Sequence, residues 1–256
     1  MNPITTAGKV DLHIQDGIAT ITFFHPSHNS LPGKILGLLA QTIKEAGENA
    51  EVKVIILKSE GDRTFCAGAS FDELIAISDL EQGKEFFMGF ANVINACRKC
   101  PKLIIGRVQG KAVGGGVGVA AATDYCMATK YAAVKLSELA VGIGPFVVGP
   151  AVERKIGVSA MSQLAINATE WKDAHWAQNK GLYTEVFEDA TLMDEAISAL
   201  ANKLASSNPD AMKGLKKICW EGCEHWDDLL AERAAMSGEL VLSPYAKNAI
   251  NAFKKK

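Results

Sequence analysis

The spacing of apolar residues changes from strand-like to helix-like several times along the first half of the chain. Residues 10–14 and 19–23 alternate apolar and polar side chains on either side of an Asp-Gly pair, which predicts a β-hairpin. Residues 52–57 and 103–108 are nearly continuous apolar runs, the pattern of strands that are buried on both faces. These runs predict the centre of a parallel sheet.

Helical periodicity occupies most of the remaining chain. Ser30 as N-cap and Pro32 in the first turn predict a helix that runs to about residue 45. Further helices are predicted over residues 81–98, 117–123, 151–156, 158–167, 172–179, 190–206, 208–222 and 226–252, and short extended segments over 125–128, 133–136 and 184–187. Strands and helices alternate first and helices dominate later, so we expect an α/β core over residues 1–190 and a helical region over 191–256.

A glycine-rich turn separates the strand at 103–108 from the helix that follows it. Gly114, Gly115 and Gly116 leave the backbone bare where another group must approach closely. A helix that begins there points free N–H groups and the positive end of its dipole at the same place. Such a turn is suited to an anion, or to an oxygen atom that becomes anionic during a reaction.

A second turn of this kind follows the strand at 52–57. Residues 65–69 read Phe-Cys-Ala-Gly-Ala, and Ser70 with Glu73 forms a capping-box pattern for a helix that begins there. If the fold brings the two turns together, one oxygen can accept a hydrogen bond from each, and each donor contributes on the order of 3 kcal/mol to a transition state. Taken singly, each turn is equally well explained as a tight connection.

Two nucleotide-binding patterns are not met. The Gly-Lys-Ser/Thr ending of a P-loop is missing. Residues 116–121 fit the loosened dinucleotide pattern Gly-x-Gly-x-x-Gly/Ala, but the next predicted strand ends in Met-Ala-Thr-Lys at 127–130, without the acid that would bind a ribose. The glycines therefore favour an oxyanion site over a nucleotide phosphate site.

Composition narrows the classes of partner. The 256 residues carry 27 basic and 29 acidic side chains and a formal net charge of −2, which argues against a nucleic-acid-binding surface. No run approaches the roughly 18 apolar residues of a membrane span, so we expect a cytoplasmic protein. Six cysteines are expected as reduced thiols. Cys97 and Cys100 have zinc-knuckle spacing, but no matching pair follows, so we expect no metal site.

The paired motifs are similar to those of the crotonase superfamily of enoyl-CoA hydratases and isomerases. The resemblance rests on residues 65–69, on 114–118 followed by Asp124, and on Ser-Glu-Leu at 137–139. It implies a β-β-α superhelical core and a helical C-terminal region that forms a homotrimer or a dimer of trimers. It also implies acyl-CoA thioester substrates, so that CoA is part of the substrate and no separate cofactor is needed.

The resemblance also implies roles for individual residues. The catalytic set would be the backbone N–H groups of Ala69 and Gly115 and the carboxyl group of Glu138. Within the two turns, the substrate contacts would be Ala67, Gly68 and Gly114. Arg63 would lie near the CoA phosphates, and Phe146 would be an apolar contact. Phe253 and Lys254 would reach the CoA of a neighbouring subunit. Alternatively, Arg63 is a solvated surface residue. Glu138 could equally form a structural ion pair with Lys135 or Arg154.

The reaction is less closely defined. Hydratases of this family typically use two glutamates, and Gly118 stands where the first would be. Local sequence around 116–119, 136–139 and 142–150 nevertheless resembles bacterial methylglutaconyl-CoA hydratases, so hydration is the expected reaction. A single Glu138 would also suit an isomerase that moves a double bond, and a crotonase-like binding protein with little activity is a third possibility. Lys135 and Arg154 are candidate partners for a carboxylate on the acyl group.

Four other polar residues are not expected to take part in the reaction. Asp72 and Glu73 are expected to act at the start of their helix rather than as acids of the pocket, and Asp124 as a structural hydrogen-bonding residue. His28 lies in a loop that borders the CoA site in the family, without a nucleophile or metal partner near it in sequence.

Overall fold

Six strands form one large sheet across the molecule. The protein is described by a computed structural model that covers residues 8–254. The strand order is β1-β2-β4-β7-β9-β11, and only the β1–β2 pair is antiparallel. Its strands are β1 (Lys9–Gln15), β2 (Ile18–Phe24), β4 (Val54–Ser59), β7 (Leu103–Val108), β9 (Tyr125–Thr129) and β11 (Glu185–Phe187). The expected hairpin is β1–β2, and the two apolar runs are the central strands β4 and β7.

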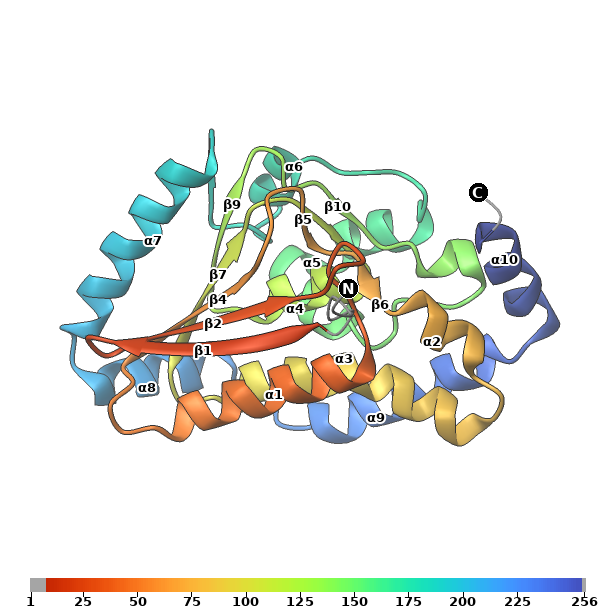
Figure 1. Ribbon diagram of the computed structural model, residues 1–256, viewed down its shortest axis with the longest axis horizontal. Helices are drawn as coiled ribbons and strands as arrows, with labels where there is room; N and C mark the ends of the chain where they lie inside the picture. Colours follow the sequence, from red (N-terminus) through yellow and green to blue (C-terminus); the bar gives the residue numbers. More distant parts are fainter. Residues whose placement is uncertain (1–7, 255–256) are drawn as a thin grey trace, which may run out of the picture.

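Two smaller sheets lie beside the large one. β10 (Val134–Lys135), β8 (Lys111–Val113) and β5 (Thr64–Cys66) form a parallel sheet in that order, and β3 (Ser30–Leu31) pairs with β6 (Gly68–Ala69). The chain passes repeatedly from a strand of the large sheet to a strand of a small sheet and then to a helix. This is the β-β-α superhelix that the resemblance implied (Figure 1).

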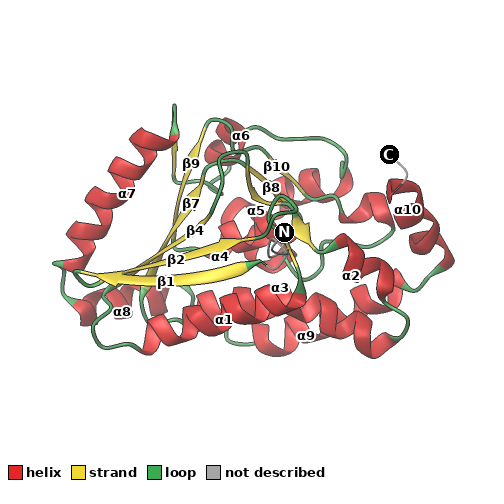
Figure 2. Ribbon diagram, viewed as in Figure 1, coloured by secondary structure: helices red, strands yellow, loops and turns green. Residues whose placement is uncertain are grey.

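The helices cover both faces of the large sheet. Figure 2 shows α1, α3 and α9 lying together along one side, and α7 along the other. The helical segments are α1 (Gly33–Glu48), α2 (Phe71–Ala76), α3 (Leu80–Lys99), α4 (Gly115–Ala122), the 3₁₀ turn η1 (Glu138–Val141), α5 (Gly149–Ile166), α6 (Ala174–Asn179), α7 (Ala190–Ala205), α8 (Pro209–Cys219), α9 (Trp226–Val241) and α10 (Pro244–Lys254). None of them is both long enough and apolar enough to cross a bilayer, over the part of the chain that is described.

The centre of the molecule is the short helix α4, in which every residue is buried. Its composition of Gly, Val and Ala follows from this position, because only small side chains fit a helix surrounded by sheet and other helices. On the outer face of the large sheet, Met193 and Ile197 of α7 pack against Val54, Ile105 and Met127 in a second apolar cluster. The helices after residue 190 thus pack directly on the sheet; the boundary at 190 stays a prediction.

Two local predictions were wrong. Ser30 is not the N-cap of α1: it lies in β3, its hydroxyl donates to the carbonyl oxygen of Ala69 at 2.7 Å, and α1 begins after Pro32 without a side-chain cap. The helix predicted over 226–252 is broken into α9 and α10, because Pro244 begins a new helix. The break predicted at residue 157, by contrast, is present, because α5 is kinked between its two halves at Gly157 (φ +73°).

Candidate active site

The glycine turn brings α4 up to the carboxyl group of Glu138. Gly114 caps α4 with φ +52°, a conformation that glycine adopts without strain. A Cβ added there would lie 2.9 Å from Oε1 of Glu138, and a Cβ on Gly115 would overlap the ring of Phe90. The two glycines therefore leave room for a carboxylate on one side and an aromatic ring on the other. As the first residue of α4, Gly115 points its N–H out of the helix end.

The two turns singled out in the sequence meet in space. A Cβ added to Gly68, in the first turn, would lie 3.9 Å from the amide nitrogen of Gly115 and 3.3 Å from the carbonyl oxygen of Val113. A Cβ on Gly116 would lie 2.5 Å from the carbonyl oxygen of Cys66. The backbones are therefore in direct contact, and Ala69 follows immediately on the first turn.

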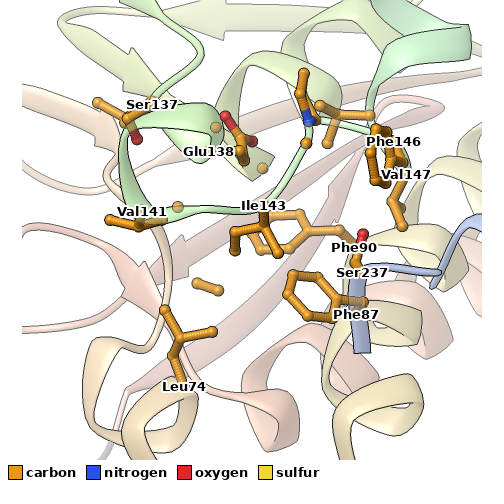
Figure 3. Close-up of a pocket in the computed structure, with 18 of the residues that line it drawn as sticks. Leu74, Phe87, Phe90, Ser137, Glu138, Val141, Ile143, Phe146, Val147 and Ser237 are labelled. Atoms are coloured by element: carbon orange, nitrogen blue, oxygen red, sulfur yellow. The ribbon is translucent and has the colours of Figure 1, made fainter. Parts of the chain in front are cut away.

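A cavity of about 290 Å³ opens in front of these two turns. Figure 3 shows its side chains converging from α2, from α3, from α9 and from η1 with the loop after it. Most of the lining side chains are aromatic or aliphatic, including Phe71, Leu74, Phe87, Phe90, Phe146 and Val148. An apolar cavity that contains a few convergent polar groups is the usual form of a small-molecule site.

Within residues 8–254, Glu138 is the only acidic residue that lines this cavity. It is the first residue of η1, and burial raises the pKa of its carboxyl group to about 7. Oε2 is buried without a hydrogen-bond partner, and no ion pair to Lys135 or Arg154 is formed. A carboxyl group with a pKa near neutrality can take up a proton and return it, which is the requirement for acid–base catalysis.

Gly118 lies where many hydratases carry a first glutamate, and the structure leaves no space for one. A Cβ added to Gly118 would lie 2.6 Å from Cγ1 of Val148 and 3.4 Å from Cδ1 of Ile94. Val148 lines the cavity, so an aliphatic side chain occupies the region into which a residue at 118 would project. The site is therefore built around a single carboxyl group.

Seven of the residues assigned by the resemblance line the cavity. These are Ala67, Gly68, Ala69, Gly114, Gly115, Glu138 and Phe146. Arg63 is exposed just before β5, where its carbonyl oxygen accepts a hydrogen bond from the N–H of Lys111 at 3.1 Å. Its assignment to the CoA phosphates stays a prediction. The side chains of Phe253 and Lys254 fall outside the described residues, and so does their predicted contact.

The two side chains expected as partners for a carboxylate on the acyl group, Lys135 and Arg154, lie in different places. Arg154 stacks on the ring of Trp220 at 3.9 Å and donates to the carbonyl oxygen of Cys219, away from the cavity. Lys135 lines the cavity, but its ammonium nitrogen lies 4.5 Å from the ring centroid of Trp171. Burial and the nearby Lys111 lower the pKa of Lys135.

Of the other polar residues, Ser70 and Glu73 form structural hydrogen bonds, whereas Asp72 and His28 are exposed. Ser70 caps α2 by accepting from the N–H of Glu73 at 3.3 Å, and the Glu73 carboxylate accepts from the N–H of Gly33 at 2.8 Å. Asp72 is exposed in the first turn of α2, and His28 is exposed in its loop with φ +55°.

Asp124 joins three parts of the chain. Its carboxylate accepts hydrogen bonds from the Ile104 N–H at 2.8 Å and the Trp220 indole at 2.8 Å, and pairs with the Lys216 ammonium at 2.9 Å.

Cys97 is fully buried near Lys216, and burial raises the pKa of its thiol to about 12. Among the described residues there is no group of three or more His, Cys, Asp or Glu side chains that could hold a metal ion.

Most side chains of the cavity wall were not assigned to the site from the sequence, and three of them show why. Phe90 covers Gly115, Val148 fills the space beside Gly118, and Ser237 lines the cavity from α9. The two apolar residues follow the same periodicity as the core, so nothing in the sequence distinguishes them. Ser237 carried no local signal at all, because its helix is remote in sequence from both turns.

Comparison with known proteins agrees with this geometry. Residues 13–255 match the family described as Enoyl-CoA hydratase/isomerase. A short-chain-enoyl-CoA hydratase of Clostridium acetobutylicum is 30% identical over 251 residues, covering 97% of this chain and 95% of that protein. The human mitochondrial methylglutaconyl-CoA hydratase is 30% identical over 200 residues, covering 77% of this chain and 58% of that protein.

Solved structures show the same fold. The crystal structure of an enoyl-CoA hydratase from Mycobacterium avium superimposes with a TM-score of 0.85 at 25% identity, covering 96% of each chain. The family match extends over nearly the whole chain and includes both facing turns and Glu138. This chain belongs to the enoyl-CoA hydratase/isomerase family.

Proposed function

We propose that this protein adds water to the double bond of a 2-enoyl-CoA thioester. The observation that carries the proposal is the contact between the two glycine turns beside the buried carboxyl group of Glu138. The thioester carbonyl oxygen would accept hydrogen bonds from the N–H groups of Ala69 and Gly115. Fixed backbone dipoles in a mostly apolar cavity stabilise negative charge on that oxygen without reorganising.

A single carboxyl group performs both proton transfers in this scheme. The Glu138 carboxylate takes a proton from water, and the resulting hydroxide adds to the β carbon of the thioester. The electron pair of the double bond moves toward the carbonyl, giving an enolate whose oxygen lies on the two N–H groups. Glu138 then returns the same proton to the α carbon, so that one water molecule is added in all. A carboxyl pKa of about 7 suits both steps near neutral pH.

The test is the ultraviolet absorbance of the conjugated enoyl thioester. We expect it to fall when the protein is added, and the product to gain the mass of one water. Glu138→Gln should abolish the change, whereas the matched exposed variant Asp72→Asn should react at the wild-type rate. An unchanged rate in Glu138→Gln would refute the assignment of the base.

Isomerisation is the second candidate, and the single carboxyl group favours it. One acid can move a proton between two carbons without activating water. With a 3-enoyl-CoA substrate, migration of the double bond into conjugation would raise the absorbance instead of lowering it. A rate with 3-enoyl-CoA above that with 2-enoyl-CoA would replace the hydratase proposal by this one.

Arg63 is proposed to meet the CoA phosphates, since it is exposed beside the first turn and is not in an ion pair among the described residues. Arg63→Gln should raise KM for the acyl-CoA and leave the KM of the matching acyl-pantetheine, which has no nucleotide, unchanged. Equal effects on both substrates would refute this role.

We also propose that the chain assembles as a homotrimer or a dimer of trimers, as the family resemblance implies. Leu215 and Ile218 on α8 expose large apolar surface, with exposed fractions of 53% and 64%. Side chains of this kind mark interaction surfaces when they gather. Light scattering should give three or six times the chain mass, and a monomer would contradict the proposal.

A further inference from the structure

Besides Lys135 and Ser137, the cavity wall contains one further polar side chain that the proposed reaction does not use. Ser237 of α9 lines the cavity with only 1% of its surface exposed. Its hydroxyl oxygen is buried and has no hydrogen-bond partner. A serine within a helix usually bonds back to a carbonyl one turn earlier, and this one does not. The hydroxyl therefore keeps both its donor and its acceptor capacity inside the cavity.

The backbone around Ser237 is fixed by a close crossing of two helices. α9 crosses α3 at Gly83 and Gly238, and a Cβ added to Gly83 would lie 2.8 Å from Cα of Gly238. This close crossing sets the residue before Gly238 against the aromatic side chains of α3. An alanine at 237 would fit the same position without burying an unsatisfied polar group, a state that native proteins rarely tolerate.

Ser237 and Glu138 lie on different sides of the cavity. Figure 3 shows Ser237 beside Phe87, with its hydroxyl turned away from its own helix, and Glu138 across the cavity from it. Phe90 and Phe146, also in the wall, offer only apolar surface. An acyl group with its thioester at the two turns and its double bond beside Glu138 would extend toward this wall.

We infer that Ser237 is a specificity-determining residue that binds an oxygen atom at the end of the acyl group remote from the thioester. The substrate class is then an acyl-CoA whose far end carries a hydroxyl or a carboxylate, in place of a plain alkyl chain. This inference rests on the proposed function, because it takes the direction of the acyl group from it. A hydroxyl group can donate to either kind of oxygen, so the ligand series must separate the two.

Equilibrium binding of saturated acyl-CoA thioesters tests the inference without turnover. Three ligands of each chain length are compared, ending in a methyl, a hydroxyl or a carboxylate group. We expect the wild type to bind one oxygenated ligand about tenfold more tightly than its methyl counterpart at one chain length, a difference of about 1.4 kcal/mol. Ser237→Ala should lose that preference and bind the methyl-terminated ligands at least as tightly as the wild type does.

Two controls separate this effect from damage to the fold. Ser237→Thr keeps a hydroxyl and should keep part of the preference, and Ser198→Ala removes an exposed serine of α7 and should change nothing. The circular dichroism spectra of all variants should match the wild type.

The outcomes are distinct. A preference for the hydroxyl or for the carboxylate ligand that vanishes in Ser237→Ala supports the inference and identifies the acyl group as neutral or anionic. If the wild type prefers methyl-terminated ligands at every length, or if Ser237→Ala leaves the ranking unchanged, the inference is wrong. Loss of hydration with the preference intact would refute the proposed reaction alone, because these ligands have no double bond to hydrate.

Discussion

Replacing Glu138 by glutamine should both stop the reaction and stabilise the protein at alkaline pH. Burial raises the pKa of this carboxyl group from its ordinary 4.5 to about 7, so the folded protein holds the proton more tightly than the unfolded chain. Each pKa unit corresponds to 1.36 kcal/mol, so ionisation of Glu138 costs the fold about 3 kcal/mol once the pH exceeds 7. The stabilisation by the protonated form is complete below pH 4.5 and is lost as the pH rises through 7.

The assay is urea unfolding of wild type and Glu138→Gln at pH 5, 6, 7 and 8, compared as a difference at each pH. Glutamine does not ionise, so the difference isolates this one group from all other titrations. We expect the variant to gain about 2.5 kcal/mol on the wild type between pH 5 and pH 8, because part of the effect is already present at pH 5. A difference that does not vary with pH would show that the carboxyl group is not buried as described, and would refute the reasoning.

Ionisation of Glu138 also governs catalysis, but here a higher pH is favourable, whereas it lowers the stability of the fold. Glu138 must begin the proposed hydration as a carboxylate, so kcat/KM of the wild type should rise with pH through an apparent pKa of about 7 and then level off. Glu138→Gln should lower kcat by a factor of about 10² to 10⁴, the usual contribution of a general acid or base. A flat pH profile between 5 and 9 would contradict the assignment.

Three further substitutions test the packing around the site. Gly114→Ala should reduce kcat and destabilise the fold by about 1–2 kcal/mol, because φ is +52° and the new methyl group would meet the catalytic carboxylate; wild-type kinetics would refute this. Gly118→Ala should cost about 1–3 kcal/mol by pressing on Val148, and Gly118→Ala with Val148→Ala should recover part of the loss in urea unfolding. Asp124→Ala should cost about 3–5 kcal/mol by leaving the buried Lys216 unpaired, with kcat per folded molecule unchanged.

The backbone part of the site was predictable because its signal is local. Gly114 and Gly115 are glycines since a Cβ at either position would strike Glu138 or Phe90, and that constraint is written directly into the sequence as a run without side chains. Glu138 could be assigned only through the family resemblance, because a lone carboxylate in the run Leu-Ser-Glu-Leu is equally compatible with a structural role.

The rest of the cavity depended on contacts that no local pattern encodes. Ser237 lines the cavity because α9 crosses α3 at a glycine pair, and that crossing joins segments more than 150 residues apart, Gly83 and Gly238. Ser30 was misread because β3 has two residues, too few to show any periodicity, while a serine near a proline is typical of a helix start. The position of Arg154 could not be predicted, because Arg154 lies in α5 and its partner Trp220 lies at the end of α8, far away in the sequence.

The most direct test is a crystal structure of Glu138→Gln with a 2-enoyl-CoA bound. The account predicts that the thioester carbonyl oxygen lies about 2.7–3.1 Å from the amide nitrogens of both Ala69 and Gly115, with the side chain of residue 138 facing the α and β carbons. A carbonyl oxygen bound by one of these nitrogens or by neither, or a double bond turned away from residue 138, would contradict it.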